Sequence, residues 1–234
     1  MEAQQDLENS VNSYMDGDGE LQVAGLMMNP DNGGVMALIG GVDYSKSQFN
    51  RAVNSKRQVG SIMKPILYYY ALENGFTSAS CFTSEKTTFN FSNNQSYTPN
   101  NYNNTYADGP ITMGAAISYS DNIYAVKTDI FLGEEGLVNM ASRLGISSSL
   151  DAVPSLALGT GEISMIEMVN AYATFANSGY QVKSHFINKV TDSEDNVLYE
   201  FKEDKEYILN EKLTFILSEM LTYTYDSTFI DYNY

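Results

Sequence analysis

Two apolar runs around a tight-turn sequence constrain the fold of the first part of the chain. LQVAGLMMNP covers residues 21–30, GVMALIGG covers residues 34–41, and Asp31, Asn32 and Gly33 separate the two runs. Such residues favour tight hairpin turns because they tolerate the left-handed backbone that these turns need. The pattern therefore predicts an antiparallel β-hairpin in this region.

Helical patterns recur through the rest of the chain, with apolar residues at spacings of three and four. Glycine follows several of these segments, as is typical of a helix C-terminus. The predicted helices cover residues 2–15, 62–74, 112–118, 122–132, 135–144, 165–178 and 210–222. Ser164 and Glu167 fit a capping box at the start of one helix. A second hairpin is predicted from residues 185–190 and 197–201.

Strands and helices thus come in separate blocks, which favours an α+β fold with a mostly antiparallel sheet packed with a helical cluster. A length of 234 residues, 43% of them hydrophobic, suits one domain with a small attachment. The turn-rich sequence DGDGE, residues 16–20, separates the attachment from the domain. We expect residues 1–19 to form a linker helix and residues 20–234 to form the main domain.

The chain is strongly acidic, with 29 Asp and Glu residues, 13 Lys and Arg residues and a formal net charge of −16. Nucleic acids and anionic membranes bind clustered basic side chains, so we expect neither as a partner. The sequence contains no apolar stretch long enough for a membrane span, and its start lacks the pattern of a signal peptide.

Cys81 is the only cysteine and His185 the only histidine. These counts leave no internal disulfide and no cluster of Cys and His for a metal ion, and a Ser-His-Asp triad would depend on His185 alone. We expect neither residue to carry the function, and we expect no cofactor and no metal. Residues 89–110, rich in Asn, Tyr, Ser and Thr, are interpreted instead as a long ordered loop at a binding site.

Ser61 and Lys64 lie one helical turn apart in the segment RQVGSIMKP. Ser61 could be an N-cap residue, which is the commoner use of a serine at a helix start. It could also be a nucleophile, provided that Lys64 is neutral and accepts the serine proton. Apolar neighbours would lower the pKa of a buried lysine towards neutrality and so permit that role.

A second polar cluster, Ser120, Asp121 and Asn122, lies in ISYSDNIYAV at a predicted turn between two helices. The hydroxyl of Ser120 could relay a proton, and the amide of Asn122 could hold a substrate. A rigid turn between helices would present both side chains to a cleft. Both motifs are too short to decide the function by themselves.

Three longer segments resemble the transpeptidase domain of the class A, or bifunctional, penicillin-binding proteins. They are GGVDYSKSQFNRAVNSKRQVGSIMKP, YTPNNYNNTYADGPITMGAAISYSDNIYAV and PSLALGTGEISMIEMVNAYATFANSGY. The similarity covers about residues 20–201, in order, and it includes the S-x-x-K and S-D-N motifs of these proteins. It implies a penicillin-binding-protein and β-lactamase-like serine acyltransferase fold.

The resemblance also implies a D,D-transpeptidase that cross-links peptidoglycan stem peptides and is acylated by β-lactam antibiotics. Ser61 would then be the nucleophile, Lys64 its proton acceptor, Ser120 the proton shuttle and Asn122 a ligand of the donor peptide. The implied location is the extracytoplasmic face of the plasma membrane. The implied parent protein is anchored in the membrane and carries a glycosyltransferase domain.

The third motif of the family, Lys-Thr/Ser-Gly, does not occur; its nearest match is Lys127-Thr128-Asp129. We therefore expect a C-terminally truncated piece with incomplete sheet strands and impaired activity. Two alternatives stay open at this point. One is a non-catalytic relative that binds penicillin as a sensor or scaffold. The other is a serine β-lactamase or D,D-carboxypeptidase.

Overall fold

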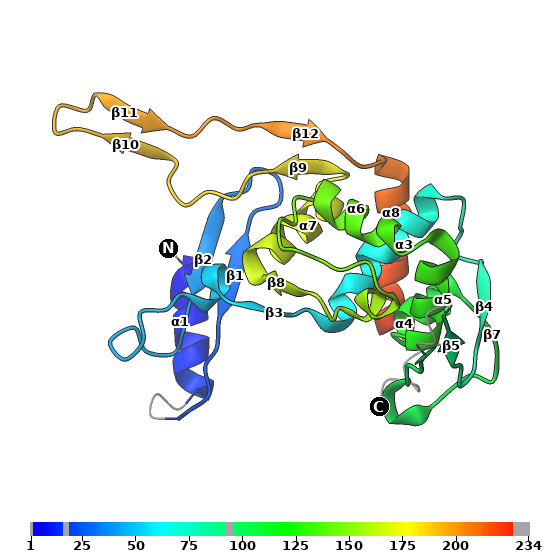
Figure 1. The fold of residues 1–234 in the computed structure, drawn as a ribbon. Helices are drawn as coiled ribbons and strands as arrows, with labels where there is room; N and C mark the ends of the chain where they lie inside the picture. Colours follow the sequence, from blue (N-terminus) through cyan, green and yellow to red (C-terminus); the bar gives the residue numbers. More distant parts are fainter. Residues whose placement is uncertain (1, 16–18, 92–95, 227–234) are drawn as a thin grey trace. The chain divides into compact units, whose positions relative to one another are not determined.

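The computed structural model describes residues 2–15, 19–91 and 96–226. The chain forms two compact units, and each is made of segments that are distant in the sequence. The first unit contains residues 1–57, 144–148 and 163–209, and the second contains residues 58–143, 149–162 and 210–234. Figure 1 shows the elements in chain order.

The first unit contains both predicted hairpins. Its elements are α1 (Glu2–Tyr14), β1 (Gly25–Met28), β2 (Val35–Ile39), α2 (Arg51–Asn54), α7 (Met165–Ala176), β9 (Tyr180–Val182), β10 (Lys189–Thr191), β11 (Val197–Glu200) and β12 (Lys205–Tyr207). The pairs β1–β2, β10–β11 and β9–β12 are antiparallel. Two further strands, β3 (Lys56–Gln58) and β8 (Glu162–Ser164), each contain a boundary between the units. The two hairpin predictions are therefore confirmed.

The predicted helix at residues 2–15 packs on the first hairpin. Gln4 of α1 binds both backbone groups of Leu38 in β2, since its amide donates to the carbonyl at 3.1 Å and accepts from the N–H at 2.7 Å. In α7 the predicted capping box is present, with Ser164 and Glu167 each bonded to the other's backbone N–H. Local caps thus fix the start of this helix.

The second unit is mainly helical. Its helices are α3 (Lys64–Glu73), α4 (Met113–Ser118), α5 (Asn122–Leu132), α6 (Glu135–Arg143) and α8 (Glu211–Thr222). Short 3₁₀ turns occur at η1 (Gly60–Met63), η2 (Tyr102–Asn104), η3 (Pro154–Leu158) and η4 (Tyr223–Tyr225). Its strands are β4 (Cys81–Ser84), β5 (Phe89–Asn90), β6 (Ser96–Tyr97) and β7 (Gly109–Thr112), and the pairs β4–β7 and β5–β6 are antiparallel.

Helix α3 forms the core of the second unit and is buried at eight of its ten positions. A helix that is apolar around most of its circumference must be covered on several sides. Helices α5, α6 and α8 contact α3, and α8 lies beside it in Figure 1. The hydroxyl of Tyr69 in α3 also accepts a 2.7 Å hydrogen bond from the backbone N–H of Asn210, which begins α8.

The α+β prediction is confirmed, and the described strands are short and pair two by two. All seven predicted helices are present in the structure, with shifts of one or two residues at some ends. Within the described residues, no helix is both long enough and apolar enough to cross a membrane.

Candidate active site

Ser61 lies in the 3₁₀ turn η1, directly before α3. The N-caps of η1 and α3 are Val59 and Met63, and neither makes a side-chain cap hydrogen bond, so the N-cap interpretation of Ser61 is wrong. The hydroxyl of Ser61 is exposed and bonds to no other described residue. It is therefore available to a ligand.

A close contact between two glycines holds the backbone just before Ser61. The N–H of Gly60 donates to the carbonyl of Gly159 at 3.0 Å. A Cβ on Gly159, whose φ is +72°, would lie 2.0 Å from the oxygen of Gly60. Only glycine fits there, because a side chain would overlap the turn that carries the serine.

Lys64, the first residue of α3, is only 3% exposed. Its Nζ donates to the Ser120 carbonyl at 2.6 Å, to Ser120 Oγ at 3.0 Å and to Asn122 Oδ1 at 2.6 Å. Burial lowers the pKa of Lys64 to about 8, although the negative charge of Asp121 opposes this shift. A lysine with this pKa is partly neutral near physiological pH.

Ser120 follows α4 in a left-handed conformation, with φ of +51°. The N–H of Ser120 donates to the Ile117 carbonyl, and the N–H of Asp121 donates to the Ala116 carbonyl. This pair of bonds defines a Schellman motif, in which the left-handed position is usually occupied by glycine. The chain instead keeps a serine, whose hydroxyl contacts Lys64.

Asp121 is the N-cap of α5 and is buried. One carboxylate oxygen accepts the Tyr124 N–H at 2.7 Å, and the other accepts from Ser84 Oγ at 2.5 Å and from Asn101 Nδ2 at 2.7 Å. Three separate donors thus hold the turn between α4 and α5 in place.

Asn122, the first residue of α5, is held by two neighbouring asparagines. Its backbone N–H donates to Asn101 Oδ1 at 2.7 Å, and its side-chain Nδ2 donates to the Asn100 carbonyl at 2.6 Å. Ser84, Asn100 and Asn101 belong to no motif that indicates a site. The only signal for them was the concentration of asparagine before Tyr102.

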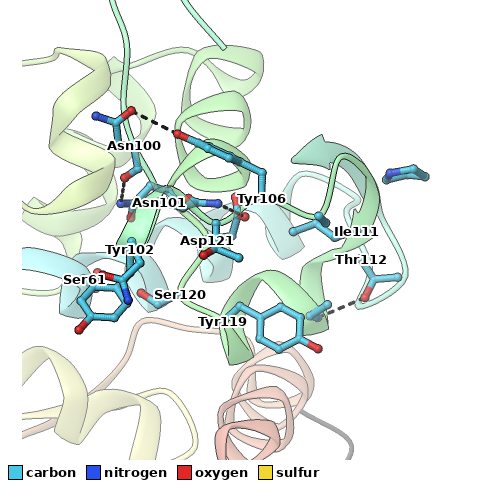
Figure 2. Close-up of a pocket in the computed structure, with 16 residues that line it drawn as sticks. Ser61, Asn100, Asn101, Tyr102, Tyr106, Ile111, Thr112, Tyr119, Ser120 and Asp121 are labelled. Carbon is cyan, nitrogen blue, oxygen red and sulfur yellow. Dashed lines mark hydrogen bonds between the residues drawn. The ribbon is translucent and has the colours of Figure 1, made fainter. Parts of the chain in front are cut away.

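These side chains border a cavity of about 1130 Å³. Figure 2 shows Ser61 and Ser120 at its wall. Its lining residues are Ser61, Asn100, Asn101, Tyr102, Asn103, Thr105, Tyr106, Ala107, Pro110, Ile111, Thr112, Ala115, Tyr119, Ser120, Asp121 and Asn122. The loop predicted at a binding site supplies many of them, although residues 92–95 lie outside the described residues.

The structure thus brings the four predicted site residues, Ser61, Lys64, Ser120 and Asn122, to one place in the second unit. Cys81 and His185 do not line the cavity. Cys81 is an exposed residue of β4, and the ring of His185 stacks on Phe201 in the first unit. Two hydroxyls at the cavity wall, one of them bonded to a buried amine of lowered pKa, form the kind of site in which a serine can be acylated.

Comparisons with known proteins identify the class. Residues 23–212 match the family model described as the penicillin binding protein transpeptidase domain, and the chain belongs to this family. It is 44% identical over 220 residues to penicillin-binding protein 2D of Bacillus subtilis. The alignment covers 94% of this chain and 32% of that protein. It is 34% identical over 185 residues to penicillin-binding protein 1A of Escherichia coli. This alignment covers 78% of this chain and 22% of that protein.

The solved structures agree with this assignment. The crystal structure of penicillin-binding protein 1A from Haemophilus influenzae is similar with a TM-score of 0.84 and 26% identity, over 88% of this chain and 36% of that one. The PonA1 protein of Mycobacterium tuberculosis in complex with penicillin V has the same fold, with a TM-score of 0.80 and 22% identity. The similarity covers 95% of this chain and 62% of that one. The expected fold is confirmed. The chain spans about a third or less of the length of these curated relatives.

Proposed function

We propose that this chain acts as a D,D-transpeptidase domain that cross-links peptidoglycan stem peptides. Ser61 Oγ attacks the penultimate D-Ala carbonyl of a donor peptide, the terminal D-Ala leaves, and an acyl-enzyme forms. An amine from a second stem peptide then attacks the acyl-enzyme and releases Ser61. The contact of Lys64 Nζ with both Ser120 and Asn122 carries this proposal, because it joins the S-x-x-K motif to the S-D-N motif.

The proton route follows from the hydrogen bonds around Lys64. A serine hydroxyl is too weak an acid to attack an amide unaided, so a base must take its proton. Lys64 takes it in the neutral form, which with a pKa of about 8 is roughly a quarter of the molecules at pH 7.5. Ser120 Oγ, 3.0 Å from Nζ, passes the proton to the leaving amine.

The groups assigned to bind the substrate lie at the same wall of the cavity. The N–H of Ser61, at the start of a helical turn, is assigned as a donor to the oxygen that becomes negative during attack. Asn122 is assigned to the backbone of the donor peptide. A β-lactam would mimic the donor and leave Ser61 acylated.

The proposal also includes the cellular location of the reaction and the parent protein. Cross-linking of peptidoglycan places the domain at the extracytoplasmic face of the plasma membrane, as part of a membrane-anchored protein with a glycosyltransferase domain. Residues 1–19 would be the linker helix and residues 20–234 the transpeptidase region. The relatives that are named penicillin-binding protein 1A and are about three to four times as long support this assignment.

Labelling with a fluorescent penicillin tests the proposal. We expect one covalent adduct, located on Ser61 by peptide mass spectrometry. Ser61→Ala removes the label, and Lys64→Ala removes it while the circular dichroism spectrum is kept. Ser13→Ala is the control, because that exposed hydroxyl bonds only to its own helix.

The other outcomes have definite meanings. If neither this chain nor a form that also carries a Lys-Thr/Ser-Gly strand is labelled, and both have native melting curves, the transpeptidase proposal is contradicted and a non-catalytic relative is favoured. Label that forms and is rapidly released as penicilloate would instead identify a β-lactamase. Labelling at the same rate in Lys64→Ala would exclude Lys64 as the base.

A further inference from the structure

The side chain of Asn101 joins two residues of the turn between α4 and α5. Its Oδ1 accepts the backbone N–H of Asn122, and its Nδ2 donates to the carboxylate of Asp121, both at 2.7 Å. Figure 2 shows the bond between Asn101 and Asp121 at the cavity wall. Because an amide has an acceptor at one end and a donor at the other, only one of its two orientations satisfies both partners.

The neighbouring Asn100 fixes the amide orientation of Asn122. The Asn100 carbonyl accepts Asn122 Nδ2 at 2.6 Å, which leaves Asn122 Oδ1 to accept from Lys64 Nζ at 2.6 Å. In the reversed amide, two donors would meet at Lys64 and two acceptors would meet at Asn100. The loop segment at residues 100–101 therefore determines which atom of Asn122 faces the lysine.

We propose that Asn101 is a positioning residue for the acylation of Ser61, an inference that rests on the proposed function. Asn101 holds its loop segment against the start of α5, so that Asn122 Oδ1 keeps Lys64 Nζ beside Ser120 Oγ. It acts through Asp121 and Asn122 and has no contact with Lys64 among the hydrogen bonds of the described residues.

The neutral amide of Asn101 has an electrostatic consequence as well. It neighbours Asp121, the carboxylate whose negative charge already raises the pKa of Lys64. A second carboxylate at position 101 would meet the first at hydrogen-bond distance, so its own pKa would rise. When protonated it would reproduce both bonds of the asparagine, and when ionised it would repel Asp121 and keep Lys64 protonated.

Asn101→Asp should therefore have a distinctive pH dependence. At pH 6 its protonated carboxyl replaces the amide, and we expect penicillin acylation within about threefold of the wild-type rate. As the carboxyl ionises, the ratio of the wild-type rate to the variant rate rises by more than tenfold between pH 6 and pH 9. Asn101→Ala lacks both bonds, and we expect it to be at least tenfold slower at every pH.

Asn104→Asp is the matched control. It makes the same change of charge in the same loop, at an exposed position that does not line the cavity. Its φ of +55° suits aspartate as well as asparagine. We expect its rate ratio to stay near one across the same pH range, and we expect its melting temperature to match the wild type.

Second-order rates of labelling by a fluorescent penicillin are measured for the 234-residue chain and its variants, together with thermal melts. A rate ratio for Asn101→Asp that is constant with pH, or a wild-type rate for Asn101→Ala, would overturn the proposal. A purely structural role would lower the melting temperatures and leave the ratio independent of pH.

A second readout separates this inference from the proposed function. If the wild-type chain is not labelled, the labelling outcomes above decide the proposed function, and the titration of Lys64 alone decides the positioning role. The Lys64 side-chain signal in a ¹³C-lysine NMR spectrum is assigned by its loss in Lys64→Arg. Asn101→Asp should raise the titration midpoint of Lys64 by about one pH unit, and Asn104→Asp should raise it by much less. Equal midpoints in the two variants would overturn the positioning role.

Discussion

The left-handed backbone of Ser120 allows the cost of keeping a hydroxyl at this position to be measured. Ser120→Gly and Ser120→Ala both remove the hydroxyl and its 3.0 Å bond to Lys64 Nζ, so they differ mainly in the backbone. With φ of +51°, alanine has a steric cost of about 1–2 kcal/mol that glycine avoids. Glycine loses about 0.4–1 kcal/mol of this advantage through the greater freedom of the unfolded chain.

The expected difference in the free energy of unfolding is therefore about 1 kcal/mol in favour of Ser120→Gly over Ser120→Ala. In a chain of this size it corresponds to about 2–4 °C in melting temperature. Differential scanning calorimetry measures the difference, and fluorescent penicillin measures the acylation rate. We expect both variants to lose acylation, since neither has the hydroxyl that is proposed to pass the proton.

Ser178 provides a matched control. It also follows a helix in a left-handed conformation, with φ of +53°, and the N–H of the next residue closes the helix end at Thr174. Ser178→Gly and Ser178→Ala should show a similar difference in stability and should acylate like the wild type. Equal stability of the two Ser120 variants, or a wild-type acylation rate in Ser120→Gly, would refute the reasoning.

Three further predictions concern groups that are partly or fully buried. Both carboxylate oxygens of Asp129 are buried without a partner among the described residues, and burial, with a smaller effect of Glu134, raises its pKa to about 7. Stability should fall as the pH rises from about 4 to 7, so Asp129→Asn should be equally stable at pH 4 but up to about 4 kcal/mol more stable at pH 8 in urea titrations. Burial raises the pKa of Glu167, but hydrogen bonds from Ser164, Ser148 and Ser147 outweigh it and hold the pKa at about 2. Glu167→Gln should therefore cost roughly 1–2 kcal/mol at pH 7, after allowance for solvent screening, and the difference should vanish as the pH falls from 4.5 to 2. Gly159→Ala should slow acylation at least tenfold because its Cβ would displace Gly60, and Gly75→Ala, where nothing lies within 4 Å, is the control.

Each of these three has a contradicting result. A stability of the wild type that does not change between pH 4 and pH 8 would exclude an uncompensated carboxyl at position 129. Equal urea midpoints for wild type and Glu167→Gln at pH 7 would mean that the serine hydroxyls add nothing to stability. Equal acylation by the two glycine variants would show that the contact between Gly159 and Gly60 does not place the nucleophile.

The helices were predictable where a cap and a periodic apolar pattern occur together. Helix α7 has a capping box at Ser164, and α5 begins directly after its N-cap, Asp121. Helix α3 was predicted to start near Ser61, but its first turn is 3₁₀, because the contact of Gly60 with Gly159 holds the preceding backbone. That contact joins residues almost one hundred positions apart, and a local pattern contains no information about it.

The residues proposed to be catalytic could be named from the resemblance, whereas the residues that contact them could not. Asn101 binds residues 20 and 21 positions away, so no spacing rule indicates it. The strands β4 and β7 were missed because each has only four residues and β7 includes Pro110. The Schellman motif at Ser120 was missed for a similar reason, since the glycine that normally marks it is replaced.

The hydrogen bond from Asn210 to Tyr69 has a consequence for the order in which the protein is made. The ribosome releases α3 early, but α8, which covers one of its apolar sides, is released 141 residues later. Until then one side of this largely buried helix stays uncovered, while all segments of the first unit have already been made. Chaperones that bind exposed apolar segments would therefore meet this protein chiefly through the helix that begins with Lys64.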